Sequence, residues 1–137
     1  MGNDFVLDAR LAADTLPLGE LALSRVLMMN DARFPWIILV PRKAGLAELL
    51  DLSEGERAVL MEEAMAAGRA LRAVAPCEKL NIGALGNIVR QLHLHVVARV
   101  EGDPAWPGPV WGSGAAKPYD ANWLKSMAGA LRRELGL

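Results

Sequence analysis

The strongest constraint on the fold is a stretch in which polar and apolar residues alternate, Gln91-Leu92-His93-Leu94-His95-Val96-Val97. This alternation is typical of a β-strand, in which successive side chains point to opposite faces of the sheet. Gln91, His93 and His95 should therefore share one face, and the apolar residues between them should pack on the other. Because two charged imidazoles would be costly to bury, we expect both rings to converge on a ligand outside the sheet.

Three further segments have the apolar character of strands, and the strand that carries the histidines is predicted to extend over 88–100. The three segments are 21–29, 36–40 and 79–82. The turn formers Asn30-Asp31 follow the first of them closely, so the first two segments should form an antiparallel hairpin.

Two helices complete the prediction. Ser53 and Glu56 have the spacing of a capping box, and apolar residues then recur every three or four positions until Pro76. Asp120 can cap a last helix. This order predicts one α+β domain over 1–137, with an antiparallel sheet of about five strands, one long helix and a C-terminal helix.

The composition limits the class of protein. The chain has 137 residues, which suffice for one compact domain. It has 15 Lys and Arg against 16 Asp and Glu, so no broad positive field would draw it to nucleic acid or to a membrane. Cys77 is the only cysteine, which excludes an intrachain disulfide and suits a reducing compartment. With no secretory signal visible at the N-terminus, we expect a cytoplasmic protein.

The residues alone leave three interpretations of His93 and His95. They could be a structural pair, or two ligands of a metal ion, although no third ligand recurs at a suitable spacing. They could also act on a phosphate, one imidazole attacking phosphorus and the other stabilising charge. The loop 83–87 contains two glycines, which would let backbone N–H groups approach an anion. Alone this loop indicates a hairpin turn, but beside two histidines it favours phosphate chemistry.

The segment 91–97 resembles the signature of the histidine triad family, His-φ-His-φ-His-φ-φ with φ apolar, at six of its seven positions. The similarity extends to other parts of the chain. Residues 27–31 and 36–42 resemble the first hairpin of the family, and Asn81 together with 83–89 resembles its phosphate-side loop.

The likeness covers about 18–100 and leaves 101–137 as a C-terminal extension and helix. Position by position, it makes His93 the nucleophile and His95 the residue that contacts phosphate and assists the leaving group, as a protonated ring. One nitrogen of His93 should be held by a backbone carbonyl, which leaves the other free to attack. Gln91 replaces the family's first histidine in the catalytic set. Its amide can still hydrogen-bond within the site, but it cannot become a cation.

The resemblance also implies which residues bind the nucleotide at its ribose, its base and its phosphate. In that order they are Asn30 and Asp31, then Met28 and Leu21, then Asn81, Gly86, Asn87 and Ile88. Ile88 stands where many members carry a Ser or Thr that bonds the phosphate, so this contact should be weaker here. Trp106 and Trp111, in a segment rich in Pro and Gly, could close over the site, pack across a dimer or pack on the sheet.

The activity implied by the resemblance is hydrolysis or transfer of a nucleoside monophosphate group, with adenosine as the expected nucleoside. The bond cleaved would join the α-phosphate to an amine, acyl or second phosphate group, through a nucleotidyl-histidine intermediate. No metal or cofactor is required, and by family analogy a second copy would complete a homodimer. Two alternatives stay open: a nucleotide sensor without turnover, and a metal-binding protein that uses His93 and His95.

Overall fold

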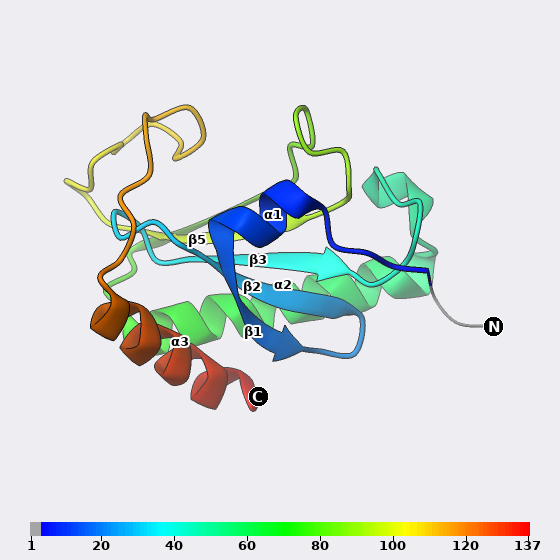
Figure 1. Ribbon diagram of the computed structural model, residues 1–137, viewed down its shortest axis with the longest axis horizontal. Helices are drawn as coiled ribbons and strands as arrows, with labels where there is room; N and C mark the ends of the chain where they lie inside the picture. Colours follow the sequence, from blue (N-terminus) through cyan, green and yellow to red (C-terminus); the bar gives the residue numbers. More distant parts are fainter. Residues whose placement is uncertain (1–3) are drawn as a thin grey trace.

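The computed structural model describes residues 4–137, and it contains one antiparallel sheet with helices and loops on both of its faces (Figure 1). The strands lie in the order β1-β2-β3-β5-β4. They are β1 Thr15–Glu20, β2 Ser24–Met29, β3 Trp36–Pro41, β4 Lys79–Gly83 and β5 Leu94–Arg99.

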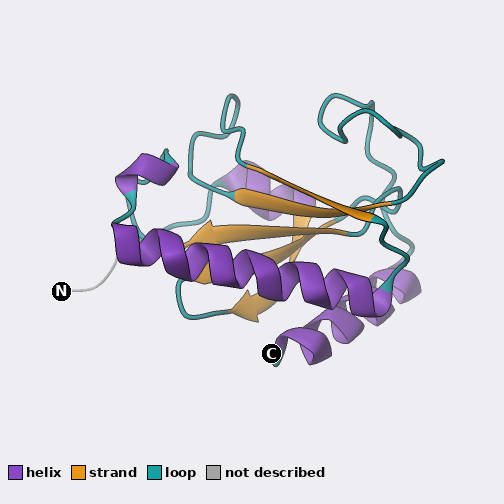
Figure 2. Ribbon diagram, turned by 180° about the vertical axis from the view of Figure 1, so that it is seen from behind, coloured by secondary structure: helices purple, strands orange, loops and turns teal. Residues whose placement is uncertain are grey.

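The helices are α1 Ala9–Asp14, α2 Glu54–Val74 and α3 Ala121–Leu135, and a 3-10 turn spans Leu49–Asp51. Helices α2 and α3 pack on one face of the sheet, whereas α1 and the long loops lie over the other (Figure 2). This arrangement confirms the predicted α+β fold with about five antiparallel strands, one long helix and a C-terminal helix. No helix within the described part of the chain is both long and apolar enough to cross a membrane.

The predicted helix starts are confirmed. The Glu56 N–H donates to Ser53 Oγ (3.1 Å), and the Ser53 N–H donates to the Glu56 carboxylate (2.8 Å), which is the reciprocal capping box. Helix α2 ends two residues before Pro76. Asp120 accepts a hydrogen bond of 2.9 Å from a backbone N–H in the first turn of α3. Each cap satisfies a donor that the helix itself leaves unpaired.

The first hairpin differs from the prediction, since 21–29 is not a single strand. A turn at 21–23 interrupts it, and the residues before that turn form β1, which the sequence analysis missed because it contains Pro17 and Gly19. β1 is an edge strand, where the missing N–H of proline is tolerated. Its pairing with β2 shifts at a bulge between Pro17 and Gly19. The predicted hairpin of β2 with β3 is present.

Strand β5 begins only at Leu94, although the prediction extended it back to residue 88. The residues before it form a loop, and the Gln91 carbonyl contacts the ring of His93 instead of a neighbouring strand. His93 therefore lies at the junction of loop and strand, whereas His95 pairs with β3.

Strands β3 and β5 are buried along their whole length, and alternation divides their side chains between two clusters. The cluster under α2 and α3 includes Ile37, Leu39, Leu94 and Val96. The cluster on the α1 side includes Trp36, Ile38 and Val97. His95 alternates with Val96, so its ring lies on the α1 side. The histidines thus lie on the face covered by α1 and the loops, opposite the face covered by α2 and α3.

Candidate active site

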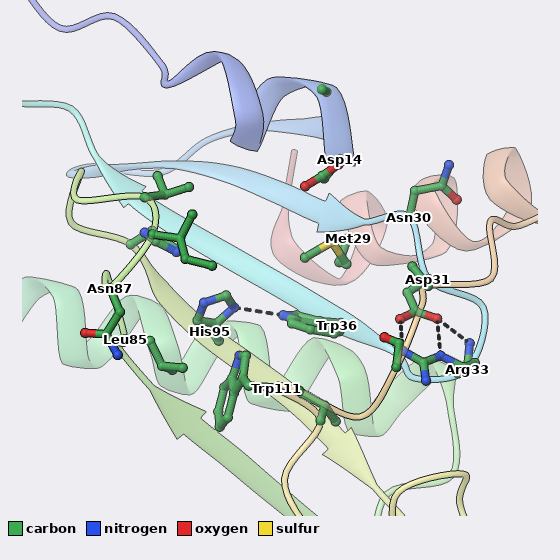
Figure 3. Close-up of a pocket in the computed structure, with 18 of the residues that line it drawn as sticks. Asp14, Met29, Asn30, Asp31, Arg33, Trp36, Leu85, Asn87, His95 and Trp111 are labelled. Atoms are coloured by element: carbon green, nitrogen blue, oxygen red, sulfur yellow. Dashed lines mark hydrogen bonds and ion pairs between the residues drawn. The ribbon is translucent and has the colours of Figure 1, made fainter.

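A cavity of about 770 Å³ opens on the α1 side of the sheet and contains both histidines (Figure 3). His93, His95 and Trp36 line it from the sheet, and four other segments form its walls. These segments are the end of α1 (13–14), the β2–β3 turn (29–33), the loop before β5 (85–89) and part of the connection to α3 (110–118). The ring centroids of the two histidines are 4.8 Å apart, inclined at 69°. They share one face and one cavity, as the alternation predicted.

The tautomer of His93 follows from its backbone contact. Its Nδ1 lies 2.7 Å from the carbonyl oxygen of Gln91. Because a carbonyl oxygen can only accept, Nδ1 carries the proton, and in the neutral ring Nε2 keeps a free lone pair. The predicted backbone carbonyl partner is confirmed, and it leaves His93 with the nitrogen that a nucleophile needs.

His95 has the opposite tautomer to that of His93. The indole Nε1–H of Trp36 donates to His95 Nδ1 at 3.0 Å. An indole can only donate, so Nδ1 is unprotonated and the proton of the neutral ring is on Nε2. Burial, together with the charge of nearby His93, lowers the pKa of His95 to about 3. The expectation of a protonated His95 is therefore wrong, because the ring is buried between Trp36 and Trp111 and its Nδ1 is occupied by the hydrogen bond from Trp36.

The low pKa of His95 should make the protein less stable in acid. The pKa is 6.5 in the unfolded chain and about 3 in the folded protein. Between these values the unfolded chain binds a proton that the folded ring does not, so stability falls as the pH is lowered. The limit for one proton is about 1.4 kcal/mol per pH unit. Urea unfolding between about pH 7 and pH 4 should show a steeper loss in the wild type than in His95→Gln. An identical pH dependence of the two proteins would contradict the neutral ring.

The side chain of Gln91 points away from the predicted catalytic position. Its Nε2–H donates to the Val6 carbonyl (2.8 Å), and its Oε1 accepts from the Asp8 N–H (2.8 Å). Gln91 is not among the described residues that line the cavity. Its contribution to the site is the backbone carbonyl that holds His93.

Five of the eight residues predicted to bind nucleotide line the cavity, namely Asn30, Asp31, Gly86, Asn87 and Ile88. Met28, Leu21 and Asn81 lie elsewhere. Met28 is fully buried on the α2 side, because alternation in β2 gives Met29, its neighbour, to the cavity face. Leu21 borders a separate groove beside α2, and Asn81 Oδ1 accepts from the Arg99 guanidinium at 2.8 Å. The binding roles of the five residues in the cavity stay predictions.

Arg33 is a cavity residue that the sequence analysis missed. It forms an ion pair of 2.9 Å with Asp31, and both side chains are largely buried. Burial alone would raise the pKa of Asp31, but hydrogen bonds from the Arg33 guanidinium and from the backbone of Arg33 and Lys117 outweigh it and hold the pKa below its ordinary value. The sequence did contain a signal for this ion pair, namely the spacing Asp31-x-Arg33 in a tight turn, because a turn brings the two opposite charges together.

The same turn fixes the cavity wall formed by the connection between β5 and α3. Arg33 donates to the Ser113 carbonyl (3.2 Å), and the Asn30 side chain accepts from the Tyr119 N–H (2.9 Å). Polar atoms of the predicted ribose residues are therefore already bonded to the chain itself. Asn30 and Asp31 build the wall as well as lining the cavity.

The two tryptophans have different positions. Trp111 lines the cavity and packs edge-on against His95, with ring centroids 5.3 Å apart. It also lies over Gly83, where an added Cβ would come within 3.2 Å of the indole. Trp106 instead lies against the buried Arg99, whose guanidinium carbon is 5.7 Å from the ring centroid. Within residues 4–137, no group of three or more His, Cys, Asp or Glu side chains gathers as metal ligands would.

The five-stranded antiparallel sheet, with His93 just before β5 and His95 within it, has the fold of solved histidine triad proteins. Residues 11–102 match the HIT domain family, and the chain belongs to this family. A search of curated proteins found no match.

Solved structures of histidine triad proteins are similar over nearly the whole chain. That from Bradyrhizobium japonicum is 46% identical, with a TM-score of 0.92, covering 96% of this chain and 98% of its own. That from Sinorhizobium meliloti is also 46% identical, with a TM-score of 0.92 and coverage of 96% and 97%. That from Marinobacter aquaeolei is 45% identical, with a TM-score of 0.93 and coverage of 96% of both chains. Membership of the family suggests nucleotide binding or hydrolase and transferase activity.

Proposed function

We propose that the protein hydrolyses or transfers nucleoside monophosphate groups, with adenylate as the expected group, through a covalent intermediate on His93. One observation carries the proposal: two imidazoles meet in one cavity, and their hydrogen bonds give them complementary nitrogens. His93 has a lone pair at Nε2, because Gln91 O holds its other nitrogen. His95 has an N–H at Nε2, because Trp36 occupies its Nδ1.

In the first step, His93 Nε2 attacks the α-phosphorus of a nucleotidyl conjugate. A P–N bond forms as the bond to the leaving group breaks, and the leaving group departs with that electron pair and takes up a proton from solvent water. The attacked ring becomes positively charged, and the carbonyl dipole of Gln91 at Nδ1–H stabilises this charge. In the second step, water attacks phosphorus and gives up a proton to solvent, and the P–N bond breaks with its electron pair returning to His93 Nε2, which releases the nucleoside monophosphate.

His95 acts in both steps as a neutral hydrogen-bond donor. Its Nε2–H would bind a non-bridging phosphate oxygen, where negative charge increases in each transition state. The ring of His95 is buried between two indoles, and the lower local dielectric there strengthens its hydrogen bond relative to an exposed one. Cavity size also supports a nucleotide substrate, because about 770 Å³ lies within the range of small-molecule sites.

The test of the proposal is a covalent adduct on His93. The protein is mixed with an adenosine phosphoramidate, quenched within milliseconds, and examined by intact-protein and peptide mass spectrometry. We expect one adenylyl group on the peptide that contains His93 in the wild type, and none on that peptide in His93→Ala. A substrate chiral at the α-phosphorus should be hydrolysed with net retention, since two displacements each invert it.

Three outcomes would contradict the proposal. Net inversion would indicate direct attack by water. Binding of AMP without turnover would support the nucleotide sensor. A stoichiometric metal ion on His93 and His95 in the purified protein would occupy the nitrogens that the mechanism requires, and would support the metal-binding alternative.

A further inference from the structure

The side-chain amide of Gln91 binds the chain in the way a neighbouring β-strand would. It donates to the carbonyl of Val6 and accepts from the N–H of Asp8, both at 2.8 Å, so it pairs with two alternate residues of an extended segment. Val6 is 79% exposed, whereas its neighbours Phe5 and Leu7 are partly buried and pack against the cluster on the α1 side. We define residues 4–14 as the N-terminal arm. The amide of Gln91 fixes the start of its helix.

The N-terminal arm leads directly to the cavity. Asp8 caps α1 by accepting from the Arg10 N–H at 2.8 Å, and Leu11 is buried against the cluster on the α1 side. The last two residues of α1, Ala13 and Asp14, then form part of the cavity wall (Figure 3). At this end the carbonyl of Asp14 accepts a backbone hydrogen bond of 3.0 Å from Asn30. The arm is therefore held at both ends, by Gln91 and by the β2–β3 turn.

The carboxylate of Asp14 differs from the other acidic group of the cavity. Asp31 is buried and its charge is compensated by Arg33. Asp14 is exposed at the cavity wall, where hydroxyl or amino groups of a bound nucleoside could donate to it. Its position depends on where α1 lies, and hence on what holds the arm.

We propose that Gln91 is a positioning residue for substrate binding: through the N-terminal arm it fixes Asp14 against the nucleoside half of the ligand. The inference rests on the proposed function for the identity of that ligand. Gln91 then acts on both sides of the site. Its backbone carbonyl fixes the tautomer of His93, and its side-chain amide positions the cavity wall formed by the end of α1. An imidazole at position 91 could not do the same, because its two nitrogens point in diverging directions, whereas a primary amide presents donor and acceptor side by side.

The test uses Gln91→Glu. This variant keeps the shape of the side chain and the oxygen that accepts from Asp8, but it replaces the N–H donor to Val6 with an oxygen. We expect AMP to bind about tenfold more weakly by calorimetry, the loss expected for one hydrogen-bonded contact. We expect kcat to fall by a smaller factor than the affinity for AMP, because the contact of the backbone carbonyl with His93 is retained. Amide hydrogen exchange in residues 8–14 should be faster than in the wild type. Arg90→Gln is the matched control, because it makes the same change of charge at an exposed neighbour.

A double-mutant cycle with Asp14→Ala decides whether Gln91 acts through the arm. If it does, Gln91→Glu should weaken AMP binding by less than about twofold in the Asp14→Ala background. Should the glutamate variant fail to fold, Gln91→Met removes both hydrogen bonds without adding charge and enters the same cycle. Independent, multiplying effects of the two substitutions would overturn the proposal. A fall in kcat with unchanged AMP affinity would also overturn it.

Failure of the proposed function would be separately visible. It would appear as a wild type without turnover or adduct, whereas the exchange rates of the arm in Gln91→Glu are measured without any nucleotide. Unchanged exchange in residues 8–14 would overturn the anchoring role of Gln91 whatever the wild type does with its substrate.

Discussion

Replacing His93 with alanine should lower turnover of an adenosine phosphoramidate by at least about 10⁴-fold, the scale seen when a covalent nucleophile is removed. The reason is that no other group in the cavity combines a free lone pair with a held proton. His93 has both, since the Gln91 carbonyl lies 2.7 Å from its Nδ1. Steady-state kinetics with the phosphoramidate, compared with the wild type under the same conditions, gives the measurement.

Two controls separate lost chemistry from lost structure. The alanine variant should still bind AMP with an affinity within about tenfold of the wild type, since the cavity walls come from other segments. Added imidazole should restore part of the turnover by entering the space that the side chain left. Turnover of His93→Ala within tenfold of the wild type would remove this residue from the mechanism.

Replacing His95 should distinguish a neutral donor from a charged one. His95→Ala removes the Nε2–H and should lower kcat by about 10²–10³-fold. It also leaves the indole N–H of Trp36 buried without its partner, at a cost of about 1–3 kcal/mol in stability. The amide of His95→Gln can accept from Trp36 with its oxygen and donate to phosphate with its nitrogen. We therefore expect the glutamine variant to lose only about tenfold in kcat.

The contrast between the two variants is the decisive comparison. If a positive charge at position 95 were needed, glutamine would be as poor as alanine, because neither can become a cation. Equal losses in the two variants, with both folded by circular dichroism, would show that the neutral-donor role is wrong.

Much of the fold follows from local patterns in the sequence. The Ser53 and Glu56 cap and the stop before Pro76 locate α2, because helix ends have unpaired backbone groups that specific side chains satisfy. The apolar stretch of β3 marks a strand buried on both faces. Strand β1 was missed because Pro17 and Gly19 argue against a strand, and only the place of β1 at the sheet edge makes them acceptable.

The candidate site was predictable in its histidines and less so in its surroundings. Alternation put His93 and His95 on one face without any knowledge of the rest of the chain. Met28 was chosen where Met29 lines the cavity, because a one-residue uncertainty in strand phase exchanges the two faces. The protonation of His95 could not be read from the sequence, since it depends on Trp36, 59 positions away in the chain. The prediction also put the Gln91 side chain in the cavity. The sequence could not show that this side chain bonds to Val6 instead, because that contact is likewise long-range.

One face of the sheet packs against α2 and α3, and the other carries the cavity. This arrangement affects how the ligand specificity of such a protein can change. Packing beneath α2 and α3 involves the wall segments only through Ala32, and these segments are short and far apart in the chain. Exchanging the mostly exposed loop 85–88 for one of another length or chemistry should therefore redirect ligand choice while melting temperature changes little. New specificities could arise on this scaffold without the loss of stability that repacking a core entails.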